Sequence, residues 1–474
     1  MSVCPLDFRY GRAQMREIFS EESKLRKLLE VEAALARAQA RAGNIPKADA
    51  EAITKAAQGG QVTLERVGVI EAEIRHDIMA VARALTEVAG PAGRFVHLGA
   101  TSNDIVDTAN GLQAREALGV LGQALEELLE VFCALAERHA RTVQVGRTHG
   151  QWAVPTTFGL KVAVYASEVQ RHLKRLDEMR DRVCVGKMMG AVGTGAGLGA
   201  KALQIQAFVM MDLGLAAPTA TTQIIQRDRH VELISALSNI ATSMEKFATE
   251  VRNLQRPEIG EVAEAFDAEK QVGSSTMAHK RNPVVSEKVC GLARIARANV
   301  YPMMESAVSW HERDLTNSSA ERFILPHTFL LTDECVRSTC EVFRTLEVYP
   351  EAMRRNLALT RGLIMAEPAM LALVERGMGR QEAHELVRQC SMAAESEGLT
   401  LKEALARNGE VSSRLKEADL DAVLDPMNYI GSAEQIVKNV LSEARAQVRR
   451  LQRRSGSATQ IRIPTAKAAT RSTK

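Results

Sequence analysis

Three long intervals without proline constrain what this chain can fold into more than any other feature. Residues 92–154, 156–217 and 219–256 contain no proline, and because proline breaks helix interiors, each interval leaves room for a long helix. Apolar residues recur there every three or four positions, which is the spacing of one helical face. No strand-like alternation of comparable length competes, so the pattern predicts an all-α protein built on a bundle of long helices. The three apolar stripes are Leu118, Leu121, Leu125, Leu128, Phe132 and Leu135; Leu160, Val164, Val169, Leu173, Leu176, Met179 and Val183; and Val231, Ile234, Leu237, Ile240, Met244, Phe247, Val251 and Leu254.

Charge is distributed unevenly along the chain. The net charge is +3, but residues 445–474 alone hold nine basic side chains and no acidic one. Removing those nine charges leaves −6 on residues 1–444. A mildly acidic body with a short basic tail is not the charge footprint of a nucleic-acid-binding protein.

Cysteine usage and the N-terminal sequence indicate the compartment. The seven cysteines are scattered, with no CxxC pair and no Cys/His cluster, which argues against both a disulfide framework and a structural zinc site. The start, MSVCPLDFRYGR, lacks the apolar run of a secretory signal. The longest charge-free stretch, residues 213–226, is too short to span a bilayer. We therefore expect a cytoplasmic protein with no membrane or nucleic-acid partner.

A chain of 474 residues exceeds the size at which one hydrophobic core keeps growing, so about three domains are expected. We expect an N-terminal helical domain over 1–111, a central long-helix bundle over 112–358 and a C-terminal helical domain over 359–444. The basic tail, 445–474, is expected to be disordered because its terminal part is polar and biased in composition.

Two loops carry residues suited to proton transfer. The segment 271–283, QVGSSTMAHKRNP, places hydroxyls beside cations, and such cations can lower the pKa of a serine or hold an anion. On composition alone, a polar surface loop is an equally good interpretation. In the segment 146–157, GRTHGQWAVPTT, Pro155 interrupts any helix, so His149 is expected in a loop or at a helix entrance. A histidine there suits general-acid work, although a structural or merely exposed histidine is the commoner case.

Other polar segments have both a functional and a structural interpretation. RHD at 75–77 and HLGATSND at 97–104 bring histidines together with residues that also cap helices. WHERDLTNSSAER at 310–322 groups guanidinium and hydroxyl donors that suit a phosphate or carboxylate, or a solvated helix start. The glycine-rich run 190–197, GAVGTGAG, follows a helical stripe instead of a strand, so we do not expect a dinucleotide site.

Taken in order along the chain, these segments resemble the signature sequences of the fumarase/aspartase superfamily and, within it, the adenylosuccinate lyase family. GSSTMAHKRNP is similar to the superfamily loop GSSxMPxKxNP, and its KRNP ending also resembles the carboxymuconate cycloisomerases. The resemblance covers roughly residues 5–445. Further matches are RY at 9–10, RHD at 75–77, HLGATSNDIVDTA at 97–109, GRTHGQ with PTT at 146–157, QRDRH at 226–230, SSAER at 318–322, MGRQEAH at 378–384 and YIGSAEQIV at 429–437.

The resemblance implies a homotetramer whose long helices form a common core and whose active sites are each shared by three subunits. It implies an anti elimination that releases fumarate from a small nucleotide, adenylosuccinate or the succinyl-carboxamide ribotide of purine biosynthesis, with no metal or organic cofactor. Ser274 would be the general base and His149 the general acid. The implied substrate-binding residues are Arg9, Tyr10, Arg75, His76, Asp77, Thr101, Ser102, Thr148, Gln223, Ser275, Lys280, Arg281, Asn282, Lys288, Arg313, Ser318 and Arg322.

Two departures from the family pattern stand out, and two alternatives remain open. Ala278 replaces the usual proline of the signature loop, and Trp152 stands where relatives usually have histidine. One alternative keeps the fold but is another fumarate-releasing lyase or a carboxymuconate-type cycloisomerase. The other is a non-catalytic structural or binding relative. A phosphate-side set that includes Arg313, Ser318 and Arg322 discriminates among them, because a substrate without phosphate does not need it.

Overall fold

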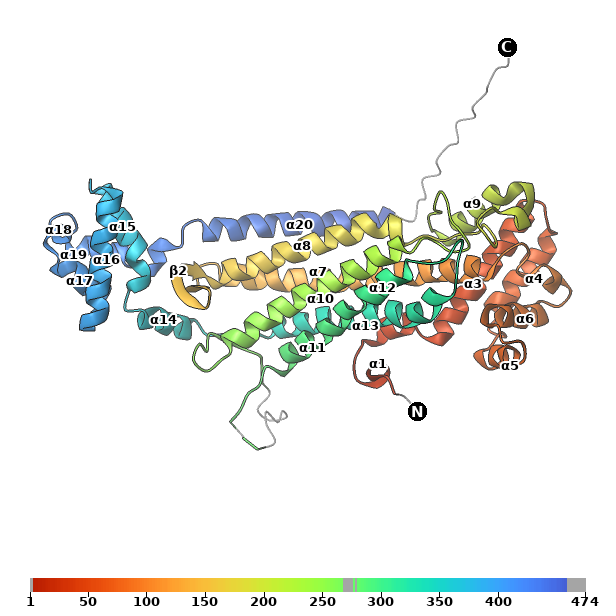
Figure 1. The fold of residues 1–474 in the computed structure, drawn as a ribbon, viewed down its shortest axis with the longest axis horizontal. Coiled ribbons are helices and arrows are strands. Elements are labelled where there is room, and N and C mark those ends of the chain that lie inside the picture. The colour runs from red at the N-terminus through yellow and green to blue at the C-terminus, as the bar shows by residue number, and fades with distance from the viewer. Residues whose placement is uncertain (1–2, 267–275, 278, 458–474) are drawn as a thin grey trace, which may run out of the picture.

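The structure, a computed structural model, describes residues 3–266, 276–277 and 279–457. The molecule is elongated and almost wholly helical, with a bundle of long helices between an N-terminal helical cluster at one end and a C-terminal cluster at the other (Figure 1). The predicted all-α class is therefore confirmed.

The bundle forms where the three apolar stripes were predicted. The stripes fall on α7, α8 and α10, and α7 packs against α8 and α13 while α10 packs against α11 and α13. Phe132 lies at the centre, with ring centroids 5.9 Å from Tyr165, 5.3 Å from Phe247 and 4.8 Å from Phe343. Each ring comes from a different long helix, so the aromatic cluster joins all four. The bundle helices are α7 (Ser102–Arg138), α8 (Phe158–Val183), α10 (Asp228–Leu254), α11 (Val284–Ala298), α12 (Val300–Ser306), α13 (Thr316–Arg344) and α20 (Ala433–Ser457).

The N-terminal cluster consists of mostly short helices around the 21-residue helix α3, and some of them begin at a capping side chain. Ser20 and Thr63 accept hydrogen bonds from backbone amides at the starts of α3 and α5, which satisfies donors that a helix start leaves unpaired. The later helix α9 packs back onto α3. The elements are α1 (Pro5–Phe8), α2 (Ala13–Ile18), α3 (Glu21–Arg41), α4 (Lys47–Gln58), α5 (Leu64–Ile74), α6 (Asp77–Ala89), η1 (Gly90–Phe95), η2 (Ala196–Lys201) and α9 (Ala202–Leu213).

The C-terminal cluster has a hydrophobic core of its own, separate from the core that the bundle shares with the N-terminal helices. No single helix in the described part of the chain qualifies as a membrane span; by length and composition, only the pair Pro350–Leu359 and Leu363–Glu375, bent by 80°, passes together. The elements are α14 (Pro350–Leu359), η3 (Leu363–Met365), α15 (Ala366–Glu375), α16 (Arg380–Glu397), α17 (Leu401–Arg407), α18 (Gly409–Ser412), α19 (Glu417–Val423) and η4 (Pro426–Tyr429).

A β-hairpin, which the sequence analysis did not predict, interrupts the helices after α7. Strand β1 (Val143–Thr148) pairs antiparallel with β2 (Gln151–Thr157). The two residues between them, His149 and Gly150, have φ values of 54° and 76°, as the tight hairpin turn that matches strand twist requires. A second, two-residue ladder joins β3 (Val262–Ala263) to β4 (Glu347–Val348).

The prediction of a disordered tail over 445–474 is wrong in its first part. Helix α20 continues to Ser457, because its apolar face still has partners: Ala444 is buried and Val448 packs against the main core. The Gln447 amide also donates to the Gln170 carbonyl at 2.8 Å. Residues 458–474 lie outside the described residues.

Candidate functional site

A cleft of about 540 Å³ at the junction of the N-terminal cluster and the bundle gathers many of the predicted residues. It is bounded by the start of α3, the α5–α6 junction and the starts of α7 and α13. The predicted residues that line it are Arg75, His76, Asp77, Ser102, Arg313, Ser318 and Arg322.

The Arg-His-Asp segment forms the sharp turn between α5 and α6. Arg75 ends α5 with a left-handed backbone (φ 55°), and the His76 side chain caps α6 by accepting from the Met79 amide at 3.4 Å. Asp77 accepts from the Arg322 guanidinium at 2.6 Å. Burial raises the pKa of Asp77, but the hydrogen bonds from the Ile78 amide and Arg322 outweigh it and the pKa is lowered. The motif is therefore anchored to α13 by an ionised carboxylate.

Arg313 reaches into the cleft from the loop before α13. It donates to Asn103 and, at 3.1 Å, to Gln223, which brings the predicted residue Gln223 to the edge of this group. Its Nε atom is buried and has no hydrogen-bond partner within the described part of the chain. Burial lowers the pKa of Arg313. A desolvated guanidinium with an unused donor suits an incoming anion such as a phosphate.

A buried charge network beneath the cleft was missed by the sequence analysis. The Arg227 guanidinium makes two hydrogen bonds of 2.9 Å to Asp107 and two, of 2.7 and 3.0 Å, to Glu321. All three side chains are under a tenth exposed. The network joins α7, the start of α10 and α13, and so fixes the floor of the cleft. The sequence did contain an indication of this network, because its three residues lie in the segments 97–109, 226–230 and 318–322 that carry the family resemblance.

This network makes a prediction about acid stability. Burial raises the pKa of Glu321, but His230 and Arg227 outweigh it and lower the pKa to about 2, against about 4.3 for a free glutamate. Its contribution is therefore present above pH ~4.3 and is lost as pH falls towards 2. Glu321→Gln should flatten the fall in unfolding free energy over that window, measured by urea denaturation. Glu17→Gln, in an exposed pair with Arg26, is the control and should hardly change the slope. If the unfolding free energy falls equally steeply with pH in wild type and in Glu321→Gln, the lowered pKa does not belong to Glu321.

The hairpin holds Thr148 and His149 far from the cleft. Helix α7 begins at the cleft with Ser102 and ends at Arg138, shortly before the hairpin. Its 37 residues correspond to a length on the order of 55 Å. Figure 1 shows β2 towards the α14 end of the bundle and α3 to α6 at the opposite end. His149 is exposed at the hairpin tip and cannot reach the cleft of its own chain.

The residues of the signature loop form a third group. Ser274 and Ser275 lie outside the described residues. Lys280, Arg281 and Asn282 lead into α11, and the first two are exposed. Arg281 lies with its guanidinium carbon 5.1 Å from the centroid of the Phe266 ring.

Four predicted residues on or near the bundle differ in how tightly they are held. Lys288 on α11 donates to Glu334 at 2.8 Å and is tied to α13. Arg9 and Tyr10 follow α1, with the Arg9 guanidinium carbon 5.9 Å from the Tyr10 ring centroid. Thr101 caps α7 in a reciprocal box with Asp104. The proposed acid and the cleft thus lie at opposite ends of the bundle within one chain. The segment before α11 lies, like the Glu261 partner of the hairpin, beside the end of α10, where Gln255 donates to the Arg281 carbonyl at 3.3 Å.

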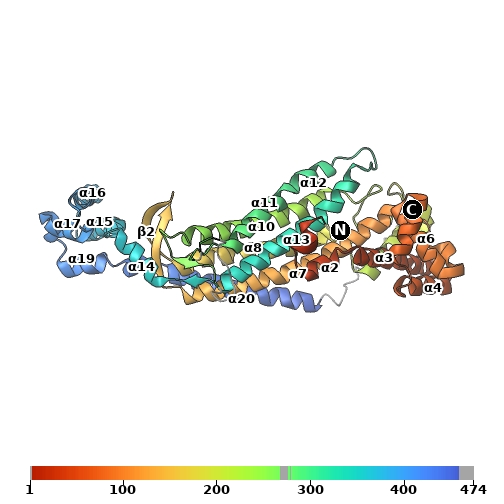
Figure 2. The same ribbon diagram turned by 90° about the horizontal axis from the view of Figure 1, so that it is seen from below.

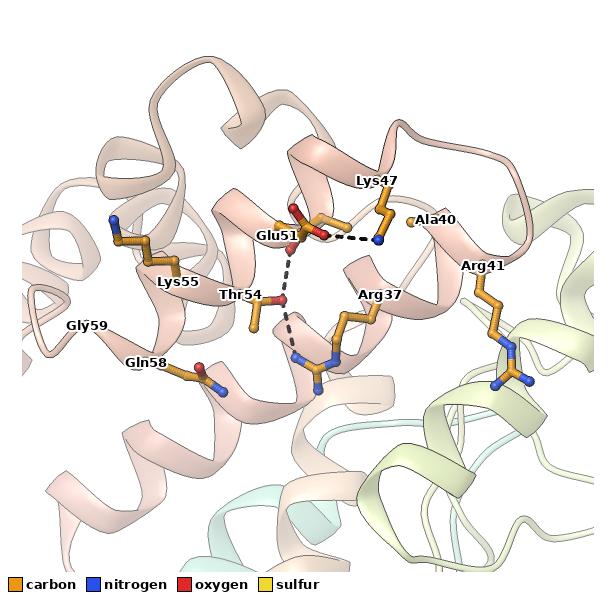
Figure 3. Close-up of a pocket in the computed structure, with 10 residues that line it drawn as sticks. Arg37, Ala40, Arg41, Lys47, Glu51, Thr54, Lys55, Gln58 and Gly59 are labelled. Carbon is orange, nitrogen blue, oxygen red and sulfur yellow. Dashed lines mark hydrogen bonds and ion pairs between the residues drawn. The ribbon is translucent and has the colours of Figure 1, made fainter. Parts of the chain in front are cut away.

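A larger pocket of about 790 Å³ between α3 and α4 contains none of the predicted residues (Figure 3). Two of its cations already have partners: Arg37 binds Thr54 at 3.2 Å and Asp212, and Lys47 lies 3.5 Å from Glu51. We therefore assign the candidate site to the cleft and the two other groups. Among the described residues, no group of three or more His, Cys, Asp or Glu side chains is placed to hold a metal ion.

Known proteins match this chain along nearly its whole length. The family described as Lyase matches residues 8–297, and the one described as Adenylosuccinate lyase C-terminus matches residues 362–440. The adenylosuccinate lyase of Pyrococcus abyssi is 55% identical, covering 95% of this chain and 100% of that protein. The adenylosuccinate lyase of Methanothermobacter thermautotrophicus is 49% identical, covering 94% of this chain and 99% of that protein.

Solved structures share the fold at lower identity. A fumarate lyase from Mesorhizobium sp. superposes with a TM-score of 0.85 at 36% identity, covering 91% of this chain and 98% of that one. A 3-carboxy-cis,cis-muconate lactonizing enzyme from Pseudomonas putida superposes with a TM-score of 0.85 at 36% identity, covering 94% of this chain and 99% of that one.

Proposed function

Because the chain belongs to the adenylosuccinate lyase family, we propose that it is a carbon–nitrogen lyase of purine nucleotide biosynthesis that cleaves adenylosuccinate to AMP and fumarate. The succinyl-carboxamide ribotide of the same pathway is the second proposed substrate. The relatives named for this reaction are 49–55% identical, against 36% for the muconate-type enzyme, which favours the lyase over the cycloisomerase.

The observation that carries the proposal is the group of anion-binding donors in the cleft. Arg313, Ser318 and Arg322 line one cavity, and the buried Nε of Arg313 has no other partner in the described part of the chain. A nucleotide phosphate offers acceptors of matching charge. Arg9 and Tyr10 complete this proposed phosphate side. Thr101, Ser102 and Gln223 lie beside it as further substrate contacts, and His76 supports the substrate from the α5–α6 turn.

The proposed chemistry is an anti elimination. Ser274 removes a proton from the succinyl Cβ, and the neighbouring carboxylate takes up the developing charge. The C–N bond then breaks, the C=C bond of fumarate forms, and His149 gives a proton to the departing nitrogen. Lys280 and Asn282 supply the cation and the amide dipole that such a dianion needs. No metal or organic cofactor takes part in this scheme.

We also propose that the active sites are shared between chains of a homotetramer. The proposed acid and the cleft lie at opposite ends of one chain, so they can complete one site only if different chains supply them. In Figure 2, α11 and α12 run along one edge of the bundle, opposite α20. Exposed apolar side chains follow these helices, and large exposed apolar patches are rare on monomers. The exposed residues from α11 to α13 are Val284, Ile295, Tyr301, Met304, Val308, Trp310, Leu315 and Phe323.

The remaining parts of the proposal follow from charge and organisation. We place the enzyme in the cytoplasm on the basis of its scattered cysteines, which suit a reducing compartment, and without nucleic-acid partners on the basis of its mildly acidic body. We propose no membrane partner, because the longest charge-free stretch, residues 213–226, is too short to span a bilayer. The domain boundaries at 111/112 and 358/359 belong to the proposal as well; the separate core of the C-terminal cluster supports the second of them.

The proposed interface predicts an effect on assembly. Tyr301→Asp should lower the mass of the oligomer, measured by light scattering after gel filtration, because it places a charge in an apolar contact. Tyr301 is 71% exposed within one chain. Leu203→Asp is the matched control, since Leu203 on α9 is equally exposed but lies outside the patch. Loss of assembly in the control alone would move the interface to another face.

The function is tested by offering purified protein adenylosuccinate, the succinyl-carboxamide ribotide, argininosuccinate and 3-carboxy-cis,cis-muconate side by side in a spectrophotometric assay. We expect turnover of the first two. Turnover of only the muconate or argininosuccinate would replace the proposal, and turnover of none would favour a non-catalytic relative.

A further inference from the structure

A single bidentate ion pair connects the hairpin tip to the segment that follows α10. Arg147, two residues before His149, donates from Nη2 to Glu261 Oε1 at 2.7 Å and from Nη1 to Oε2 at 3.1 Å. The Arg147 side chain is 16% exposed and the Glu261 side chain is fully buried. Paired, desolvated and planar contacts of this kind fix orientation better than one hydrogen bond does.

Glu261 is itself fixed from several sides. Its amide donates to the Leu254 carbonyl at the end of α10, and its carbonyl accepts from the Tyr349 amide, both at 3.0 Å. Its carboxylate also accepts from the Asn356 side chain of α14 at 2.8 Å. The carboxylate is therefore a rigid anchor built from α10 and α14, while Arg147 is the part that it holds.

The hairpin needs such an anchor because its ladder is irregular just below the tip. The register shifts between Val145 and Arg147, where two residues of β2 lie opposite Gly146. A Cβ at Gly146 would come within 2.4 Å of the Val154 carbonyl oxygen, so the strands approach closely there. Bulges of this kind bend the strand and change where the following side chains point.

We propose that Glu261 and Asn356 are positioning residues that act through Arg147 to hold His149 in its catalytic orientation. This inference rests on the proposed function, in which His149 protonates the leaving nitrogen. A proton donor must lie within hydrogen-bond reach of its target, and a displacement on the order of 1 Å can cost about 10²-fold in rate. The pair contributes no atom to the substrate, and its effect passes only through the hairpin.

A double-mutant cycle separates this role from a general structural one. Glu261→Gln keeps the size of the side chain but removes its charge and one acceptor, and should lower kcat for adenylosuccinate by about 10²-fold. In a His149→Ala background the same change should lower kcat by less than about three-fold, since there is no acid left to position. An equal loss in both backgrounds would overturn the proposal.

Hydrogen exchange gives a readout that does not depend on activity. Backbone amides of residues 143–157 should exchange at least about ten-fold faster in Glu261→Gln than in wild type, while α7 and α10 stay protected. Arg147→Lys, which keeps the charge but loses the bidentate geometry, should show the same effect with less risk to folding. Glu87→Gln, in the exposed pair with Arg66, is the control and should change neither exchange nor kcat.

The two proposals fail in different ways. If wild-type protein does not cleave adenylosuccinate, the proposed function is wrong, and faster exchange in Glu261→Gln would still support the anchoring of the hairpin. If wild type is active but both exchange and kcat are unchanged in Glu261→Gln and Arg147→Lys, the positioning role is wrong and the function stands.

Discussion

Ser274→Ala should lower kcat for adenylosuccinate by at least about 10³-fold, in the range expected for loss of a proton-transfer group. Ser274 lies outside the described residues, so the expectation rests on the chemistry of the loop and on its resemblance to the family signature. A serine is a poor base at its ordinary pKa, and the cations that follow it in the sequence, Lys280 and Arg281, are what would make it effective.

The oligomer mass and the helical circular dichroism of this variant should equal those of wild type. Ser396→Ala, on the C-terminal helix α16, serves as a control for serine removal and should keep full activity. If Ser274→Ala itself keeps its activity, Ser274 is not the base, and Ser275 and His149 become the groups to test for that role.

The largest effect on stability is expected at Asp104, at the start of α7. Its carboxylate accepts from the amides of Thr101, Met189 and Gly190, each at 2.9 Å, and pairs with the Lys187 ammonium. Both charged side chains are fully buried. Asp104→Ala leaves a buried ammonium without its counter-charge and should reduce the free energy of unfolding by about 3–5 kcal/mol.

Substitution of the other member of the pair, Lys187, provides the comparison. Lys187→Met leaves the Asp104 carboxylate with its three amide donors, so it should cost clearly less than Asp104→Ala. Both are measured by urea denaturation at one protein concentration, because assembly makes apparent stability depend on concentration. A loss below about 1 kcal/mol in Asp104→Ala would show that Lys187 finds other partners or water.

The long helices could be predicted because their information is local. The stripe Leu118 to Leu135 repeats every three or four residues, and its members are buried on α7 as expected. The hairpin could not be predicted in the same way, because β1 has only six residues and β2 contains Pro155, a residue that argues against a strand. The two positive φ values at His149 and Gly150 leave only a weak trace in the sequence.

The candidate site likewise contains features that the local sequence predicts and features that depend on the whole fold. The segments RHD and HLGATSND had two interpretations. The structural one, capping by Asp, Ser or Thr, is confirmed for Thr101 at the start of α7, whereas in RHD the cap of α6 is His76 and Asp77 is the first helical residue. Their roles towards a substrate stay predictions. The buried network of Asp107, Arg227 and Glu321 was missed because charged residues are usually exposed, and the burial of a charge is a property of the whole fold.

The central proposal is that the proposed acid and the phosphate-binding cleft act in one site although they lie far apart in one chain. Its most direct test mixes two inactive variants, His149→Ala and Arg322→Ala, after dissociating and reassociating the oligomers. Mixed oligomers then contain some sites with neither substitution, so adenylosuccinate cleavage should return in the mixture while each variant alone stays inactive. A mixture that reassembles but remains inactive would contradict the claim, because both residues would then belong to the same chain in every site.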